Sequence, residues 1–145
     1  MRALVQRVSR AAVRAGGDTI AEIGDGMLLL VGVGHEDTEE DASAIADKVA
    51  NLRIFPDNDG KMNRSVLDCG GHVLVVSQFT LYADTRKGRR PSFVGAAPPD
   101  VAEPIVRRVA ARLEELGVRA PMGEFGAHME VELTNDGPVT ILVET

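Results

Sequence analysis

The 145-residue sequence predicts one α+β domain in which a mostly antiparallel β-sheet, or partial barrel, packs against two helices. Two patterns lead to this class. Short apolar or alternating runs, separated by turns rich in Gly and Asp, are typical of strands. Two longer segments carry apolar residues at spacings of three and four, which is typical of amphipathic helices. The length suits a single core, and neither an internal repeat nor a linker divides residues 1–145.

The strands are predicted where apolar runs end at turn residues. The first three follow one another closely, which suggests an antiparallel meander. The third is a continuous apolar run and is expected at the centre of the sheet. The predicted strands cover residues 2–14, 19–23, 27–33, 72–78, 128–133 and 139–144, with a further short strand at 52–55 before a turn at 56–60.

The first helix is predicted over residues 38–52, where Thr38 is a suitable N-cap and three acidic residues complement the helix dipole. The second is predicted to begin at an Asp100 cap and to end at Leu116, before Gly117. Residues 79–99 lie between the sheet and this helix without clear periodicity. A loop of that length in a small domain is usually functional or disordered.

Composition excludes several classes of protein. Hydrophobic residues make up 44% and charged residues 26%, as in a globular protein, and aromatics only 3%. A net charge of -6 argues against a protein that coats nucleic acid non-specifically, but a local basic patch remains possible. One cysteine, no apolar leader and no bilayer-length apolar run indicate a soluble, cytoplasmic protein.

Some candidate sites are unconvincing. The three histidines, His35, His72 and His128, lack metal-ligand spacing, and no metal is expected. The glycines at 32 and 34 are not followed by a phosphate-loop lysine, and residues 57–60 fit a turn better than a calcium loop. Cys69 has no evident basic partner and is expected to be inert.

Ser77, Gln78, Phe79 and Thr80 lie where an apolar strand gives way to the long irregular segment. Such a strand end offers backbone N–H groups and small hydroxyls to a ligand, although two ordinary hydroxyl residues would look the same. Neither a nucleophile elbow nor a His–Asp pair accompanies Ser77 or Thr80. A hydrolytic site here would stabilise an oxyanion rather than supply a side-chain nucleophile.

The stretch NDGPVT, residues 135–140, separates the last two predicted strands. Asn-Asp-Gly alone predicts a hairpin turn. The Gly137–Pro138 step adds a fixed φ and bare backbone carbonyls, which suits close approach to a ligand. A plain turn and a ligand-sensing turn both remain open.

Four cations cluster within the long segment at Arg86, Lys87, Arg89 and Arg90. In a net acidic protein such a run could hold phosphates by charge and by bidentate arginine contacts. A solvated loop is the alternative.

The sequence resembles the D-aminoacyl-tRNA deacylases, a family of small dimeric enzymes, essentially from end to end. The two family signatures, SQFTL at 77–81 and NxGPxT at 135–140, are both intact. His128 is a departure, because the family pattern has an acidic residue there. Further similar stretches are residues 6–8, 52–55, 60–63, 88–93 and 125–127.

The resemblance implies a homodimer that hydrolyses the ester between a D-amino acid and the terminal adenosine of tRNA, without a cofactor. It further implies that Gly137 and Pro138 form a cis peptide that enters the other subunit's active site and excludes L side chains. Arg7 would hold this motif. Residues Ser77, Gln78, Phe79 and Thr80 would form the catalytic pocket, with either Thr80 or the adenosine 2′-hydroxyl driving hydrolysis. No contact with DNA or membrane is expected.

Because such a filter excludes a side chain, we expect glycyl-tRNA, including glycine misplaced on alanine tRNA, to be cleaved as well. Two alternatives remain. A binding protein of the same fold would show no turnover. An esterase of small D-amino-acid esters would lack the salt sensitivity that phosphate contacts impose.

Overall fold

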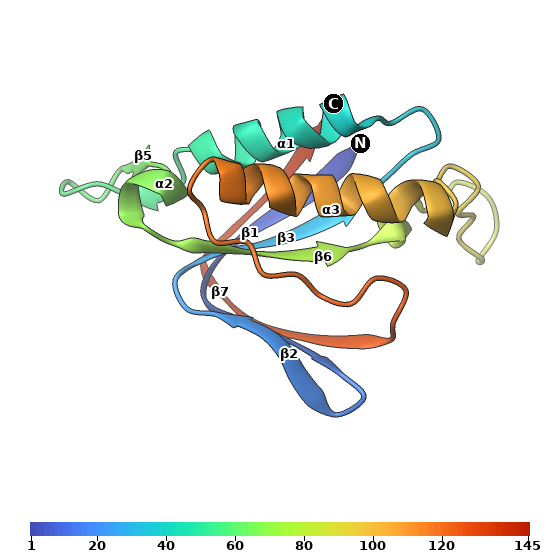
Figure 1. Cartoon of the computed structure of the whole chain (residues 1–145), viewed down its shortest axis with the longest axis horizontal. Helices are drawn as coiled ribbons and strands as arrows, with labels where there is room; N and C mark the ends of the chain where they lie inside the picture. Colours follow the sequence, from blue (N-terminus) through green and yellow to red (C-terminus); the bar gives the residue numbers. More distant parts are fainter.

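Strand β1 (Arg2–Ala15) is paired along both of its edges in the computed structural model, which describes all residues 1–145. One edge carries β7 (Met129–Glu144). The other carries β3 (Gly26–Gly32) against the first half of β1 and β2 (Asp18–Ile23) against the second half. Strand β6 (His72–Ser77) pairs with β3 in parallel and completes the sheet. The sheet curls strongly, with β2 and the start of β7 turning away from the helices (Figure 1).

The predicted meander is wrong, although the mostly antiparallel sheet is confirmed. A meander would place β2 between β1 and β3. Instead, the 14 residues of β1 are long enough to pair with β3 through Arg2–Val8 and with β2 through Ala11–Ala15. Central strand β3 is confirmed, and it is apolar on both faces because both faces are covered.

Two helices cover one face of the sheet, as predicted (Figure 1). Helix α1 (Glu39–Asn51) has the predicted Thr38 cap, whose side chain and that of Asp41 form a capping box. Helix α3 (Pro99–Glu115) begins earlier than predicted. Pro98 is its N-cap residue, and Asp100 lies in the first turn instead of capping it, because proline is well suited to the first helical position.

The connection between α1 and β6 is more structured than predicted. The expected strand at 52–55 is reduced to β4 (Phe55–Pro56), which pairs with β5 (Met62–Arg64) in a small hairpin outside the main sheet. The predicted turn between them is present, and the Asp57 carboxylate accepts hydrogen bonds from the backbone of Asp59 and Lys61. One-turn helices α2 (Val66–Cys69) and η1 (Phe79–Tyr82) were not predicted.

Strand β7 also differs from the prediction. The two strands expected at 128–133 and 139–144 are one continuous strand that follows β1 along nearly its whole length. The stretch between them is therefore not a hairpin turn, because both flanks pair with the same partner strand.

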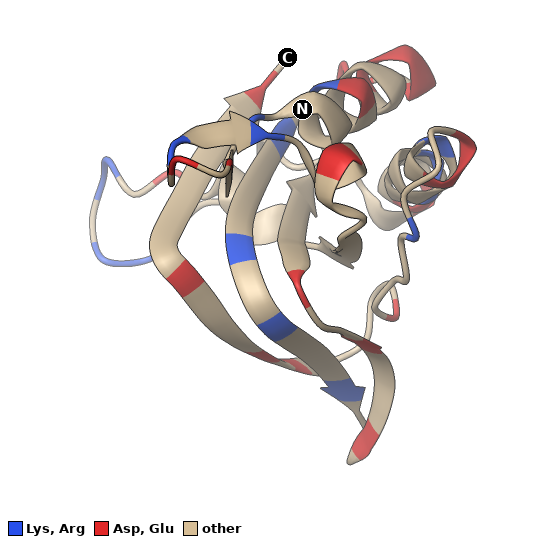
Figure 2. Cartoon of the chain, turned by 90° about the vertical axis from the view of Figure 1, so that its left-hand side faces the viewer, with Lys and Arg blue, Asp and Glu red and all other residues tan.

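Apolar side chains form a core on each face of the sheet. The larger lies beneath α1 and α3 and includes alternate residues of β3, such as Met27, Leu29 and Val31. The smaller lies inside the curl, between β2, β6 and the first part of β7. On the outer edge of the curl, basic residues of β1 lie between acidic residues of β2 and β7 (Figure 2). None of the helices is long and apolar enough to cross a membrane.

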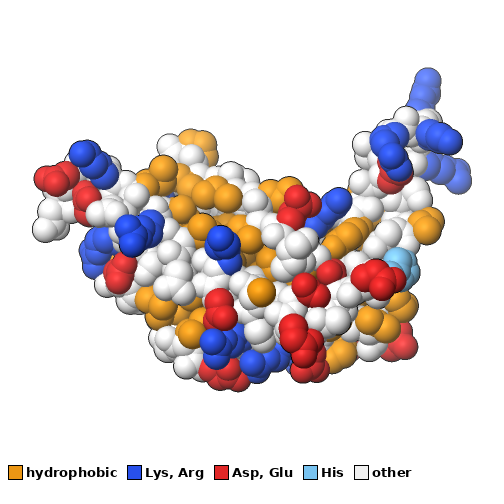
Figure 3. Space-filling view, turned by 90° about the horizontal axis from the view of Figure 1, so that it is seen from above, with side chains coloured by type: hydrophobic (Ala, Val, Ile, Leu, Met, Phe, Trp, Pro, Cys, Tyr) orange, Lys and Arg blue, Asp and Glu red, His pale blue; other side chains and the backbone are white.

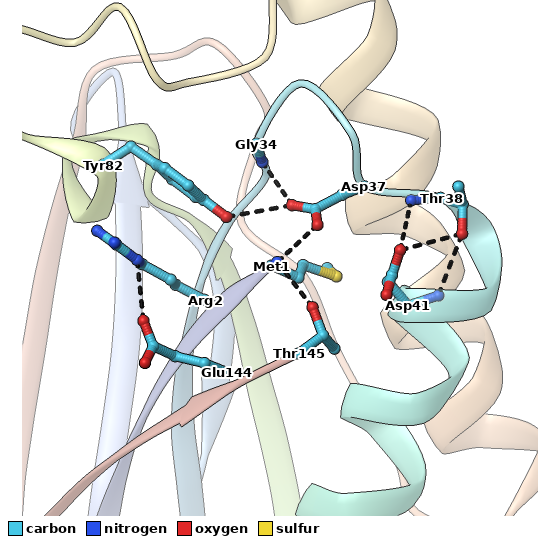
Figure 4. A network of polar contacts seen from close by, with 9 residues as sticks. All are labelled: Met1, Arg2, Gly34, Asp37, Thr38, Asp41, Tyr82, Glu144 and Thr145. Atoms are coloured by element: carbon cyan, nitrogen blue, oxygen red, sulfur yellow. Dashed lines mark hydrogen bonds and ion pairs between the residues drawn. The ribbon is translucent and has the colours of Figure 1, made fainter.

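The first and last residues meet in a partly buried polar network (Figure 4). The Met1 ammonium group, with no exposed side-chain surface, donates to Asp37 Oδ1 at 2.6 Å and Thr145 Oγ1 at 2.8 Å. The other Asp37 oxygen accepts from Gly34 N and Tyr82 Oη. Burial and the negative charge of Asp37 raise the pKa of Tyr82 to about 12. The network ties β1, β7, η1 and the β3–α1 loop together.

Tyr82 also explains the glycine pair that the sequence shows at 32 and 34. A Cβ atom on Gly34 would lie 3.0 Å from the Tyr82 ring, and one on Gly32 would lie 3.2 Å from it. These glycines therefore serve ring packing at the end of β3, which agrees with the absence of a phosphate-loop pattern.

We predict that Asp37→Asn lowers the free energy of unfolding by about 3 kcal/mol, because the buried Met1 ammonium loses its counter-charge. Tyr82→Phe removes only one hydrogen bond to the same carboxylate and should cost about 1 kcal/mol. Urea unfolding of both variants and the parent, at one protein concentration, measures the difference. Equal losses would show that the ion pair stabilises the fold no more than the tyrosine hydroxyl does.

Candidate active site

A cavity of about 390 Å³ opens at the end of β6. Nine of its 13 lining residues are hydrophobic, and three of the chain's four phenylalanines, Phe79, Phe93 and Phe125, are among them. The remaining lining residues come from the ends of β3 and β6, the segment before α3, the first turns of α3 and the loop before β7: Val31, Val33, Ser77, Gln78, Ala96, Ala97, Pro99, Ala102, Val106 and Gly126. In a chain so poor in aromatics, this concentration marks the cavity as the main candidate for a planar ligand.

The SQFTL stretch forms one wall and the rim of the cavity. Strand β6 ends at Ser77, and the Gln78 N–H donates to Val31 O at 2.7 Å, which fixes the turn into η1. Phe79 is 57% exposed and packs edge-on against Phe93, with ring centroids 5.1 Å apart. Ser77, Gln78 and Phe79 line the cavity, whereas Thr80 lies at the exposed rim outside it.

The hydroxyl of Thr80 has no general base beside it. Its partner is the Gln78 carboxamide, which is not basic, and Ser77 makes no side-chain hydrogen bond at all. By contrast, the backbone N–H groups of Phe79 and Thr80 begin the η1 turn and have no acceptor in the chain. The rim therefore offers hydrogen-bond donors to a developing negative charge rather than an activated nucleophile.

The NDGPVT stretch forms a bulge in β7. Asn135 lies opposite Val8 and Thr140 opposite Gln6, so that residues 136–139 together face the single residue Arg7. The Asn135 side chain closes the base of the bulge, since its Oδ1 accepts from Val139 N at 3.1 Å and its Nδ2 donates to Thr140 Oγ1 at 3.0 Å.

Arg7 supports this bulge from the sheet. Its Nε donates to Asp136 O at 3.0 Å, and its Nη1 donates to Ile54 O at 2.5 Å. Gly137 and Pro138 are exposed beyond this support, and the peptide between them is cis, as the resemblance implies. At a φ of +136°, a Cβ on Gly137 would lie 2.8 Å from the Val139 side chain, so the position favours glycine.

The bulge and the cavity lie far apart in one chain. Arg7 is level with Met27 and hence with Val73, whereas the cavity begins at Ser77, four residues further on and three strands across. With about 3.3 Å per residue and about 4.8 Å between strands, the separation along the sheet is roughly 20 Å. Neither Gly137 nor Pro138 lines the cavity. The structure thus brings the residues of the SQFTL stretch together at the cavity. It places the Gly137–Pro138 step away from them in the same chain.

The basic cluster at 86–90 forms a projecting loop (Figure 3), which leads directly into Phe93 of the cavity lining. Two backbone hydrogen bonds between Asp84 and Ser92 close its base, directly before Phe93. Arg86 makes a bidentate ion pair with Asp84, which lowers the pKa of that carboxyl group. The loop therefore leaves three cations without a carboxylate partner: Lys87, Arg89 and Arg90.

Sequence reasoning did not assign Phe93 and Phe125 to the site. They are distant from Phe79 in the chain, and the available signal was the rarity of phenylalanine itself. It also overlooked the side chain of Asn135, whose place two residues before the Gly-Pro step is explained only by the hydrogen bonds across the bulge.

Comparison with known proteins gives consistent matches. Residues 4–144 match the family model described as D-Tyr-tRNA(Tyr) deacylase. Proteins named D-aminoacyl-tRNA deacylase from Roseiflexus castenholzii and Thermomicrobium roseum are 59% and 60% identical over 145 residues, covering 100% of this chain and 92% and 94% of theirs.

Solved structures show the same fold. The c-Myc DNA unwinding element binding protein superposes with a TM-score of 0.93 at 42% identity, over 100% of this chain and 99% of that one. A probable eukaryotic D-amino acid tRNA deacylase superposes with a TM-score of 0.82 at 17% identity, over 98% and 97% of the two chains.

Proposed function

The chain belongs to the D-Tyr-tRNA(Tyr) deacylase family, and we propose that it hydrolyses D-aminoacyl-tRNA to the free D-amino acid and tRNA. It is an enzyme of the carboxylic ester hydrolase class. The observation that carries the specific proposal is the pairing of an aromatic cavity, rimmed by SQFTL, with a projecting Gly137–Pro138 bulge. The aromatic cavity suits the terminal adenine, which can stack against phenylalanine, and the ester then lies at the rim.

We propose that two chains assemble so that Gly137 and Pro138 of each enter the other's cavity. The roughly 20 Å separation within one chain supports this arrangement. An apolar row also remains open on the face away from the helices, where Leu4 is paired with Leu30 on one side and with Leu142 on the other. Leu142 is 50% exposed, and covering it with a second copy would remove an apolar patch from water.

The chirality filter follows from this arrangement. The carbonyl oxygens of Gly137 and Pro138 accept hydrogen bonds from the substrate α-ammonium group, while the same backbone occupies the volume an L side chain needs. A D side chain points outward to solvent, so its identity matters little. Selection acts by exclusion, and glycine, which has no side chain, passes the filter.

The chemistry proceeds without an activated side chain. Water attacks the ester carbonyl with the help of the adenosine 2′-hydroxyl, and the free N–H groups of Phe79 and Thr80 stabilise the tetrahedral oxyanion. The C–O bond to the ribose then breaks, which releases the D-amino acid and leaves a ribose hydroxyl on the tRNA. Thr80, hydrogen-bonded to a carboxamide, lines the rim and is not the nucleophile.

We predict that the purified enzyme cleaves D-tyrosyl-tRNA and glycyl-tRNA, including glycyl-tRNA(Ala), and spares L-tyrosyl-tRNA. Side-by-side deacylation assays with the three esters test both the reaction and the filter. Loss of the L ester at a similar rate would refute exclusion by the Gly-Pro motif, and stability of glycyl-tRNA would refute selection by side-chain exclusion alone. Binding without turnover would favour a ligand-binding protein.

Gly137→Ala should lower kcat/KM for D-tyrosyl-tRNA by about 100-fold while the dimer survives, because the methyl group presses on Val139 and Arg7 and displaces the filter. Gly17→Ala is a matched control: Gly17 also has a positive φ, yet nothing lies within 4 Å of its added Cβ. Activity and size-exclusion profiles check both variants. Normal deacylation by the Gly137 variant would remove this residue from the active site.

Thr80→Val should lower kcat less than about tenfold, whereas a substrate ending in 2′-deoxyadenosine should react about 100-fold more slowly or worse. Single-turnover deacylation with both enzyme forms and both tRNA termini measures these effects. If the valine variant is inactive on normal substrate and the 2′-deoxy ester is cleaved well by the parent enzyme, Thr80 is the nucleophile after all.

A further inference from the structure

Cations without carboxylate partners are concentrated in two segments. Of 16 lysines and arginines, eight form ion pairs, namely Arg2, Arg7, Arg10, Arg14, Arg86, Arg107, Arg108 and Arg112. Six of the other eight lie in the 86–90 loop or in the segment 53–64, which contains the β4–β5 hairpin; the last two, Lys48 and Arg119, lie elsewhere. The group of cations in the segment 53–64 has no part in the function proposed above.

The hairpin cations are Arg53, Lys61 and Arg64, and all three are exposed. Arg64 Nη2 donates to Asp68 O at 2.8 Å, and Arg53 Nη1 donates to Asn63 Oδ1 at 3.5 Å. Both partners are uncharged oxygen atoms, so these hydrogen bonds orient the guanidinium groups without forming an ion pair. The Asp68 carboxylate offsets part of the charge: hydrogen bonds from Ser65 lower its pKa, and the charges of Arg64 and Arg53 lower it further. The nearby Asp57 carboxylate is occupied by backbone N–H groups of its own turn.

The hairpin adjoins the Gly-Pro bulge through one side chain. Arg7 hydrogen-bonds both to Asp136 O in the bulge and to Ile54 O at the start of the hairpin. The start of the hairpin segment therefore lies next to the bulge. In Figure 1 the hairpin lies at one end of the molecule, whereas the yellow 86–90 loop lies at the other.

We infer that Arg53, Lys61 and Arg64 form a second phosphate-binding patch, which contacts the tRNA whose terminal ester occupies the cavity of the other protomer. This inference rests on the proposed function and on its exchanged Gly-Pro motif. In that dimer, the hairpin of one protomer and the 86–90 loop of the other flank the same cavity. Phosphodiesters of the acceptor end then meet cations from both chains, and arginine suits their bidentate recognition.

The first test compares two triple variants with the same change of charge. Arg53→Gln/Lys61→Gln/Arg64→Gln should lower kcat/KM for D-tyrosyl-tRNA at least tenfold. The slope of log kcat/KM against log salt concentration should become less negative by about two. The same variant should cleave the minimal ester D-tyrosyl-adenosine, which has no phosphates, at the parental rate. The control, Lys48→Gln/Arg107→Gln/Arg119→Gln, should retain activity on both esters.

The patch is refuted if the hairpin variant loses no more activity on tRNA than the control variant does. It is also refuted if the minimal ester suffers equally, because that result indicates a structural defect. A parent enzyme that cleaves neither ester would instead overturn the proposed function, and the inference with it.

The second test locates the patch across the interface, in heterodimers purified through two tags. One chain carries Gly137→Ala, which leaves one working site: the cavity of that chain with the bulge of the other. When the hairpin substitutions are placed in the chain that carries Gly137→Ala, activity should not change. When they are placed in the chain with intact Gly137, activity should fall about tenfold. The reverse pattern would mean that the hairpin serves its own chain's cavity.

Discussion

The β1–β7 pairing is the constraint on which the arrangement of the site depends. Because β1 is paired along both edges, extra residues in β7 cannot be absorbed within the sheet, and residues 136–139 must project opposite Arg7. Arg7 then fixes the projection to β1 and, through Ile54 O, to the neighbouring hairpin. Exposure of bare Gly-Pro backbone is therefore a direct result of register, held in place by the Arg7 side chain.

The same sheet separates the two halves of the candidate active site. Parallel pairing of β6 with β3 sends the SQFTL stretch to the end of the sheet where α3 and three phenylalanines close a cavity, while the bulge lies four residues back and three strands away. Each half is incomplete in its own chain: the cavity has no group that senses chirality, and the bulge has no cavity. In the proposed dimer, two copies related by a twofold axis would complete both sites at once.

Local patterns predicted local structure well. Apolar spacing located both helices, the Thr38 cap located the start of the first, and the turn at Asp57 follows from its residue types. Pairing between distant segments was not encoded in those patterns. The continuity of β7 depends on its match to β1, and the parallel β6 depends on the crossover through α1. Likewise, the motif residues were named from resemblance, but Phe93 and Phe125 joined the site only through the fold.

The distribution of charge reconciles an acidic protein with an RNA substrate. Most cations of the sheet and helices are neutralised by carboxylates, as in the ladder of Arg10 and Arg14 with Glu132, and contribute to the fold rather than to long-range attraction. The remaining -6 net charge repels polyanions from most of the surface. Phosphates are attracted only where unpaired cations gather, in the 86–90 loop and in the segment 53–64, at opposite ends of one protomer. The proposed dimer would bring these ends together, so that phosphate binding and the chirality filter would arise from the same assembly step.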